Sequence, residues 1–194
     1  MNSFDIGVIG ATGIVGQTFL RILQERQFPY RSIRLCASKR SIGKNIKVGE
    51  NDIAVEEASP RLFSEVDIAF ISANTEVSKD LASVAVRNGA MVIDDSSAFR
   101  MQPNVPLVIP EVNPEDLENH CGIVSIPNCS TTPLAMILKP LMDFNPIKRV
   151  IADTYQSVSG TGTAALQELN IQSQLVLDGR SVETAAYPHQ IAFN

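Results

Sequence analysis

The chain has 194 residues, of which 44% are hydrophobic and 19% are charged. This length suits one domain, or one domain and part of another, and the mixed charges argue against a long disordered tail. The formal net charge of −5 argues against a general nucleic-acid surface. No apolar run reaches membrane-spanning length, and the first residues lack the features of a signal peptide. Three cysteines without CxxC spacing predict a cytoplasmic protein with thiols and no metal centre.

Strand and helix patterns alternate through the first part of the chain. Short apolar runs bounded by turn residues predict strands, and apolar positions three to four residues apart predict helices. The predicted strands cover residues 4–10, 32–38, 66–73, 90–96, 106–112 and 121–127, with two short strands in 45–55. The predicted helices cover residues 13–26 and 75–89. This alternation predicts an α/β fold, a Rossmann-like and mostly parallel sheet covered by helices on both faces.

The pattern changes after Asn128. A helix is predicted at 130–144, and Pro140 should kink it or end it. A long alternating strand is predicted at 147–160, and residues 162–179 are mostly helical in pattern. The second part of the chain therefore has the pattern expected for the start of another domain.

The segment "GVIGATGIVG" carries glycines at the junction of the first predicted strand and helix. Gly10 permits a tight turn, Gly13 lets the backbone approach a pyrophosphate, and Gly16 lets the helix pack closely on the strand. The diphosphate then lies at the positive N-terminus of the helix. A glycine-rich turn without a ligand is the alternative, but the strand before it and the helix after it favour a dinucleotide site. The predicted contacts are Gly10, Thr12, Gly13, Ile14 and Val15.

The end of the second strand bears on the choice of dinucleotide. A site that prefers NAD usually has an Asp or Glu there, which binds the ribose 2′-hydroxyl. The sequence "CASKRSIGK" has no carboxylate, and Arg40 can bind a phosphate while Ser38 and Ser41 donate to it. NADP is therefore the predicted cofactor, with a solvated basic loop as the alternative.

Cys129 lies in "SIPNCSTTPLAMI", where a predicted strand ends and a predicted helix begins. A helix N-terminus stabilises a thiolate through its dipole and its amide groups, and the thiolate is the reactive form of cysteine. A buried structural cysteine is the alternative, and it is the commoner fate of this residue type. A nucleophilic thiol together with a nicotinamide site indicates aldehyde chemistry through a thioester.

Several motifs in the same order resemble aspartate-semialdehyde dehydrogenases, over essentially all 194 residues. They are "GATGIVG", "ASKRSIGK", "VIDDSSAFRMQPNVPLVIPEVNPEDL", "PNCSTTPLAMILKPL" and "TYQSVSGTG". N-acetyl-gamma-glutamyl-phosphate reductase is a related alternative, but its cysteine is usually followed by Tyr-Pro-Thr. Here Ser130, Thr131 and Thr132 follow Cys129, which favours the aspartyl enzyme.

The resemblance implies that the enzyme makes L-aspartate 4-semialdehyde from 4-aspartyl phosphate and NADPH. This reaction supplies lysine, threonine, methionine and diaminopimelate biosynthesis. Cys129 would be the nucleophile that forms the thioester, and Arg100 would bind the phosphate group. Asn128 would donate to an oxygen of the substrate beside the nucleophile, cap the helix, or do both.

The motif "TYQSVSGTG" corresponds to the substrate and nicotinamide loop of the family. The resemblance implies that Gln156 orients the substrate and that Ser159 and Gly160 lie against the cofactor. The family usually has "SGAG" where this chain has "SGTG", so Thr161 adds a methyl and a hydroxyl group.

The general acid-base histidine of the family, in a "GHSE"-like segment, has no match among the two histidines of this chain. His120 and His189 are therefore assigned no catalytic role. The resemblance predicts an NADP-binding Rossmann domain at 1–128 and an incomplete α+β catalytic and dimerisation domain at 129–194. The predicted partners are small molecules and, in a homodimer or tetramer of the whole enzyme, copies of the chain. A non-catalytic NADP-binding fragment is the remaining alternative.

Overall fold

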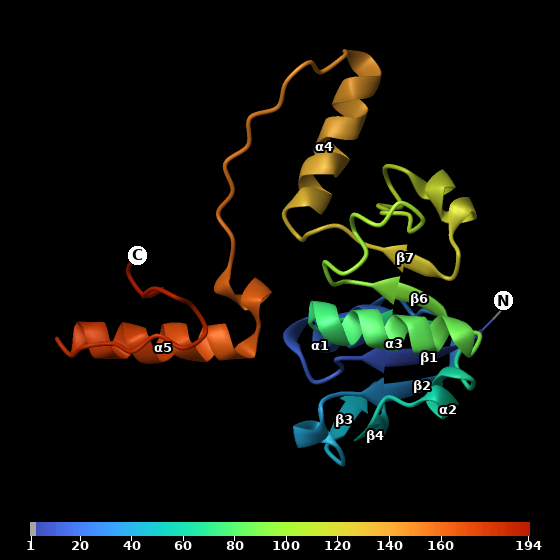
Figure 1. Ribbon diagram of the computed structural model, residues 1–194, viewed down its shortest axis with the longest axis horizontal. Helices are drawn as coiled ribbons and strands as arrows, with labels where there is room; N and C mark the ends of the chain where they lie inside the picture. The colour runs from blue at the N-terminus through green and yellow to red at the C-terminus, as the bar shows by residue number, and fades with distance from the viewer. Residues whose placement is uncertain (1–2) are drawn as a thin grey trace. The chain divides into compact units, whose positions relative to one another are not determined.

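The computed structural model describes residues 3–194, which form two compact units that divide between Val150 and Ile151 (Figure 1). The first unit is built on one seven-stranded sheet, in the order β3-β4-β2-β1-β5-β6-β7. All neighbouring strands are parallel except β3 and β4, so the predicted α/β fold is confirmed. The strands are β1 (Phe4–Ile9), β2 (Tyr30–Cys36), β3 (Asn45–Val48), β4 (Asn51–Glu56), β5 (Ile68–Ile71), β6 (Met91–Asp94) and β7 (Ile123–Ser125).

β1 lies near the middle of the sheet, with β2 on one side and β5 on the other. The chain moves from β1 to β2 in one direction, and β5, β6 and β7 extend the sheet in the other direction. Such a reversal leaves a crevice at the carboxyl ends of the central strands, which is where open α/β sheets bind ligands. The glycine-rich segment follows β1 directly and therefore lies at this crevice.

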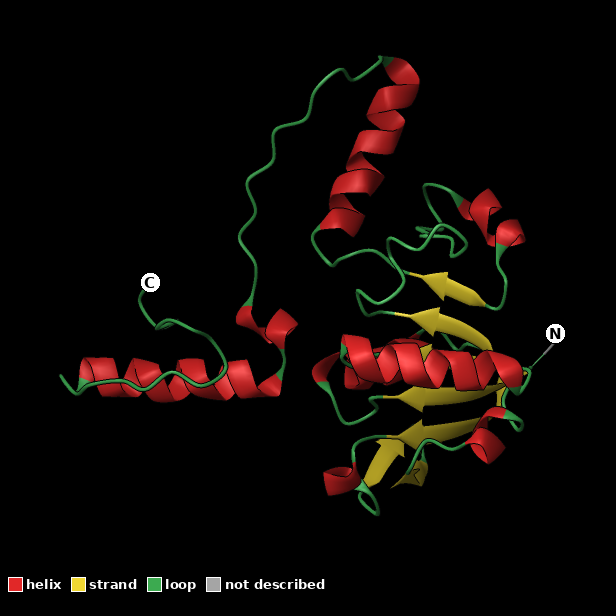
Figure 2. Ribbon diagram, in the orientation of Figure 1, coloured by secondary structure: helices red, strands yellow, loops and turns green. Residues whose placement is uncertain are grey.

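Helices lie on both faces of the sheet, and Figure 2 shows one of them, α3, crossing in front of the strands. One apolar cluster contains Leu20 and Leu23 of α1, and the other contains Ala82 and Ala85 of α3. None of the helices in the described part of the chain is long and apolar enough to cross a membrane. The helices of this sheet are α1 (Ile14–Glu25), α2 (Pro60–Phe63) and α3 (Thr75–Arg87).

The predicted strand at 106–112 is wrong. This segment makes one isolated parallel bridge, between Leu107 and Ser125 of β7. Val108 N–H donates to Ser125 O at 2.9 Å. The two prolines of the segment have no N–H groups, and a longer ladder would need those donors. The segment therefore pairs at one point instead of forming an eighth strand.

α4 (Thr131–Phe144) confirms the helix predicted after the cysteine, and it runs through Pro140. Of the two predicted effects of this proline, a kink or an end, the end does not occur. A proline at this position removes one donor, the one that would bond Met136 O, whereas later residues still donate. Asn145 N–H, for example, donates to Leu141 O at 2.9 Å. One missing hydrogen bond is therefore insufficient to end this helix.

The second unit contains α5 (Thr163–Leu177) and a short 3-10 turn, η3 (Val158–Thr161). α5 confirms the predicted helix, but the strand predicted at 147–160 is wrong, because these residues contain no strand. A strand needs a neighbour for its N–H and C=O groups. Ile151 and Tyr155 are 79% and 103% exposed. The described residues thus contain no strand that pairs with this segment.

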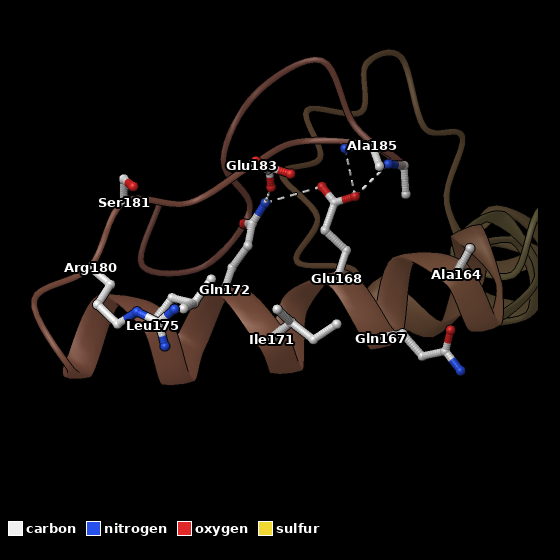
Figure 3. A pocket seen from close by; sticks show the side chains of 11 residues that line it. Ala164, Gln167, Glu168, Ile171, Gln172, Leu175, Arg180, Ser181, Glu183 and Ala185 are labelled. Atoms are coloured by element: carbon white, nitrogen blue, oxygen red, sulfur yellow. Dashed lines mark hydrogen bonds between the residues drawn. The ribbon is translucent and has the colours of Figure 1, made fainter.

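Two buried side chains of α5 hold the C-terminal segment against this helix (Figure 3). The Glu168 carboxylate accepts the N–H groups of Ala185, at 2.9 Å, and of Ala186. Gln172 Nε2 donates to Glu183 O at 2.8 Å and to Glu168 Oε1 at 3.2 Å. The backbone donors, that of Ala186 above all, hold the pKa of Glu168 below its ordinary value. The deprotonated Glu168 carboxylate is therefore the form that accepts these hydrogen bonds and holds the C-terminal segment against α5.

Glu168→Gln is expected to loosen the C-terminal segment while α5 stays helical. A neutral amide oxygen is a weaker acceptor than a carboxylate, so the amide protons of Ala185 and Ala186 should exchange several-fold faster. Because the folded pKa is lowered, this stabilisation is present above the ordinary value of 4.5 and is lost as the pH falls through the folded pKa. Hydrogen exchange measured against pH tests both effects, with the exposed Glu183→Gln as the control. Equal exchange in the two variants would contradict this role.

Candidate active site

Gly10 ends β1 in a backbone conformation that favours glycine, with a φ of +87°. Its N–H donates to Cys36 O at 2.9 Å, and Ala11 N–H donates to the same oxygen at 3.0 Å. A Cβ on Gly10 would lie 2.0 Å from Ser72 O, just beyond β5. The turn therefore passes tightly between the ends of β2 and β5, at the crevice of the sheet.

Gly13 and Gly16 set how α1 approaches the strand. A Cβ on Gly16 would lie 2.3 Å from Gly10 O, so a side chain there would push the helix away. Gly13 has an ordinary φ of −77° and is the N-cap of α1 without a side-chain cap. The first helical hydrogen bond runs from Gln17 N–H to Gly13 O at 2.9 Å. Gly13 N–H donates to Gly10 O, so the amides of residues 14–16 are those that this helix N-terminus offers to a phosphate.

The exposure of this segment fits a ligand site. Thr12, Ile14 and Val15 are all exposed, although two of them are apolar. α3 differs, because its N-terminus is capped by Asn74, whose Oδ1 accepts from Val77 N–H at 3.0 Å. The N-terminus of α3 is thus capped by a side chain, whereas the capping position of α1 is a glycine that has no side chain to offer.

The predicted phosphate loop follows β2 as the short 3-10 turn η1 (Lys39–Ser41). Ser38 and Arg40 are exposed, whereas Ser41 is buried, and Ser41 N–H donates to Ser38 O at 2.8 Å. Lys39 forms an exposed ion pair with Glu57 at 3.9 Å, which is worth little. The turn therefore presents the Arg40 side chain to solvent beside the end of β2.

Arg100 is anchored by backbone oxygens. Its Nε donates to Ile126 O at 3.0 Å, and its Nη2 donates to Asp95 O at 2.9 Å. These two bonds fix the plane of a half-buried guanidinium and use two of its five donors. Ile126 lies three residues before Cys129, so at most about 10 Å of extended chain separates the cysteine from the residue that this guanidinium contacts.

Sequence reasoning missed the polar side chains around the loop whose Asp95 backbone oxygen holds this arginine. Asp95 Oδ2 accepts from Ser72 Oγ at 3.1 Å, and the hydroxyls of Ser97 and Thr75 lie 3.0 Å apart. Burial raises the pKa of the Asp95 carboxyl, while Ser72 and Arg100 oppose the shift. The available signal was the run "DDSS" after a buried strand, because parallel strands end at one edge of the sheet.

Cys129 lies in the turn that joins β7 to α4. Asn128 Oδ1 accepts from Ser130 N–H at 3.0 Å and from Ser130 Oγ at 2.7 Å, and it lies 3.9 Å from Cys129 Sγ. Asn128 O accepts from the N–H groups of Thr131 and Thr132 at 3.0 and 3.1 Å. Asn128 thus holds the turn before α4, whose N-cap is Ser130 without a side-chain cap, and the exposed Cys129 lies in this turn, before the helix begins at Thr131.

The three cysteines differ in their surroundings. Cys36 is buried, and burial raises its pKa to about 12. Cys121 and Cys129 are both exposed. Cys121 therefore provides an exposed thiol that lies outside the turn at the start of α4.

The predicted substrate and nicotinamide loop belongs to the second unit. Gln156 and Gly160 are exposed there, and Ser159 is half-buried. Ser159 donates to Ser157 Oγ through its N–H at 3.3 Å and through its hydroxyl at 2.9 Å. Within this unit the loop therefore has a local structure of its own, formed around a serine-capped turn.

Two family models match this chain. The model of the semialdehyde dehydrogenase NAD binding domain matches residues 5–120, and that of the semialdehyde dehydrogenase dimerisation domain matches residues 138–194. The chain belongs to the semialdehyde dehydrogenase family. The first match covers the sheet, the glycine-rich turn and Arg100, and Cys129 lies between the two matched segments. A nicotinamide dinucleotide is therefore the cofactor of the first domain.

Relatives agree with this assignment. The chain is 44% identical over 189 residues to the aspartate-semialdehyde dehydrogenase of Prochlorococcus marinus, covering 97% of this chain and 55% of that protein. It is also 44% identical over 196 residues to that of Bacillus subtilis, covering 97% of this chain and 57% of that protein. The resemblance drawn from the motifs is confirmed. The chain spans a little over half the length of these curated relatives.

Solved structures of this semialdehyde dehydrogenase family share the fold. Aspartate semialdehyde dehydrogenase II of Vibrio cholerae, complexed with ASA, aligns with a TM-score of 0.95 at 41% identity, over all of this chain and 58% of that chain. The aspartate semialdehyde dehydrogenase of Candida albicans, with NADP, aligns with a TM-score of 0.66 at 31% identity, over 75% of this chain and 48% of that chain. The chain thus belongs to an oxidoreductase family of amino-acid biosynthesis.

Proposed function

We propose that the protein carrying this chain reductively dephosphorylates 4-aspartyl phosphate with NADPH, giving L-aspartate 4-semialdehyde and phosphate. The observation that carries the proposal is the short link from Ile126 to Cys129. Arg100 Nε bonds Ile126 O at 3.0 Å, and Cys129 is exposed at the start of α4. A thiol and a phosphate-binding guanidinium thus serve one reaction centre. The product supplies lysine, threonine, methionine and diaminopimelate biosynthesis.

The first chemical step is carried out by Cys129 and the residues around the segment from Ile126 to Cys129. The Cys129 thiolate, stabilised by the N-terminus of α4, attacks the carbonyl carbon of the acyl phosphate. A carbon–sulfur bond forms, the bond to the phosphate oxygen breaks, and phosphate leaves with the electron pair. Arg100 stabilises the charge on the departing phosphate, because a guanidinium matches its oxygen atoms. Asn128 holds the turn and offers its amide to the carbonyl oxygen that becomes negative.

The first unit fits a dinucleotide. The glycine-rich turn is followed by an uncapped and exposed N-terminus of α1, which suits a diphosphate. Arg40, with Ser38 and Ser41, is proposed to hold the 2′-phosphate of NADP. When bound, NADPH supplies the hydride that reduces the thioester to the aldehyde.

The proposal also assigns roles to residues in the second part of the chain. Gln156 orients the substrate, and Ser159 and Gly160 lie against the cofactor. The NADP-binding domain is proposed to end at residue 128, and 129–194 belong to the catalytic and dimerisation domain. The dimerisation-domain match supports a homodimer or tetramer, which sedimentation of the whole protein measures.

Phosphate-dependent reduction of NADP by aspartate semialdehyde tests the reaction in reverse. The whole protein that carries the chain should prefer this aldehyde to N-acetylglutamate semialdehyde, which the related reductase uses. A polypeptide of residues 1–194 should bind NADP but turn over slowly, because general acid-base help is worth about 10²- to 10⁴-fold. Fast turnover by this polypeptide would contradict the need for a further histidine. Failure of every longer polypeptide to reduce NADP would end the proposal.

Cys129 is expected to be alkylated faster than the other two cysteines at neutral pH. Both it and Cys121 are exposed, so a difference between them reports the stabilisation of the thiolate by the start of α4. Cys36 should react last, since it is buried and its pKa is raised to about 12. Peptide mass spectrometry after brief iodoacetamide treatment gives the order. Equal rates for Cys121 and Cys129 would count against a nucleophilic role.

Arg40→Ala is expected to weaken NADPH binding by roughly 10- to 100-fold and to leave NADH binding almost unchanged. The reason is that a charge-assisted contact to the 2′-phosphate is worth about 1.5–3 kcal/mol, and NADH has no such phosphate. Titration calorimetry with both dinucleotides measures the effect, and Arg87→Ala in the last turn of α3 is the control. An equal loss for NADH, or no loss for either, would contradict the assignment.

A further inference from the structure

Three buried side-chain oxygens of the described residues lack a hydrogen-bond partner. They are Ser78 Oγ, Asp94 Oδ2 and Ser125 Oγ. Each of these residues is 0% exposed. Buried polar atoms are nearly always hydrogen-bonded, and a carboxylate oxygen without a partner is strongly unfavourable. These oxygens therefore need hydrogen-bond partners that the neighbouring side chains do not supply.

The register of the sheet puts these oxygens on one face. Asp94 and Ser125 are Cα partners at the ends of the parallel strands β6 and β7, so their side chains point to the same side. Val92, two residues before Asp94, packs in the same cluster as Ala82 of α3. That side of the sheet is therefore the one beneath α3. Ser78 lies one turn before Ala82 and is buried on the inner side of this helix.

Asp94 also holds the loop that carries Arg100. Its Oδ1 accepts from Ser96 N–H at 3.0 Å and from Ser96 Oγ at 2.7 Å. Its backbone oxygen accepts from Ile126 N–H at 3.0 Å, and Arg100 Nε donates to Ile126 O at the same distance. The position of the guanidinium therefore depends on where Asp94 is held.

We propose that one internal water molecule links Asp94 Oδ2, Ser125 Oγ and Ser78 Oγ beneath α3, and that Asp94 is thereby a positioning residue for Arg100. Neighbouring strands are about 4.8 Å apart, a spacing that a bridging water suits when two side-chain oxygens do not bond directly. A buried water typically makes about three hydrogen bonds, here one donated to the carboxylate and two shared with hydroxyls. The inference rests on the proposed function only for the role of Arg100 as phosphate anchor.

A crystal structure at a resolution that resolves ordered water tests the site directly. A water within hydrogen-bond distance of Asp94 Oδ2 and Ser125 Oγ is expected in the wild-type chain and should be lost in Ser125→Ala. A direct hydrogen bond between Asp94 and Ser125, or a dry cluster, overturns the proposal. This measurement requires no turnover, so its outcome is separate from that of the proposed reaction.

The positioning role needs a readout at the arginine itself. In Ser125→Ala, the Arg100 Nε–H proton should exchange with solvent roughly three- to tenfold faster, as loss of one net hydrogen bond implies. Ser83→Ala is the matched control, because Ser83 lies on the outer side of α3 and its hydroxyl donates to Lys79 O of the same helix. The backbone amides of β1 should keep their protection in both variants. Unchanged exchange at Arg100, or an equal change throughout the sheet, contradicts the proposal.

Discussion

Cys129→Ala is expected to lower the turnover of aspartate semialdehyde by roughly a thousandfold or more, because no thioester can form without the thiol. The residue is exposed, and the turn around it is held by Asn128, so the fold should be little affected. Dinucleotide binding should therefore remain within about twofold of the original, since small changes at exposed positions rarely propagate. Steady-state rates and cofactor titration on the whole protein separate the two effects.

Cys121→Ala is the matched control for this variant. Cys121 is also exposed, but the next element after it in the chain is the strand β7 and not a helix. Its removal should change neither the rate nor the binding. If the two alanine variants lost the same activity, the loss would reflect general damage by cysteine replacement. If neither lost activity, the thioester mechanism would be wrong.

The parts of this fold that were predictable from sequence are those in which local pattern and long-range structure agree. Buried parallel strands are apolar along their length, and the helices between them carry apolar residues on one side, so each element could be recognised alone. The glycine-rich turn was predictable because Gly10 needs a positive φ that few other residues adopt. The turn before α4 was less predictable, because Asn128 bonds Ser130 in this turn while the N-cap of the helix is Ser130 itself.

The errors fell where structure depends on a distant partner. Residues 147–160 alternate as a strand does, but a strand forms only when it pairs with another strand, and the described residues contain no strand here. Residues 106–112 meet β7 at a single bridge. An alternating pattern indicates which side chains of a strand could face a core. It does not show that a neighbouring strand is present.

The support for Arg100 was invisible for a related reason. Asp95 and Ser72 are far apart in the chain, and each is an ordinary polar residue just after a strand. Their hydrogen bond follows from the strand order, which puts the ends of β5 and β6 side by side. Sequence alone identified the arginine through a family motif, whereas the groups that hold it required the register of the sheet.

Gly10→Ala is expected to destabilise the first unit by about 3–5 kcal/mol, a large part of the stability of an ordinary domain. Two costs combine at this position. A left-handed backbone conformation costs an alanine about 1–2 kcal/mol. The new Cβ would also lie 2.0 Å from Ser72 O, and since that atom is backbone, relief requires β1 and β5 to move apart. Urea unfolding followed by circular dichroism measures the loss as a shift of the midpoint.

Gly43→Ala separates these two costs. Gly43 has a φ of +80°, close to that of Gly10, but a Cβ there would have no atom within 4 Å. Its alanine variant should therefore lose only the conformational part, about 1–2 kcal/mol. The difference between the variants measures the price of the close approach between the glycine-rich turn and the end of β5. Equal losses in both variants would mean that Gly10 does not approach Ser72 O this closely in solution. The crevice at the ends of the strands would then be wider than in this structure.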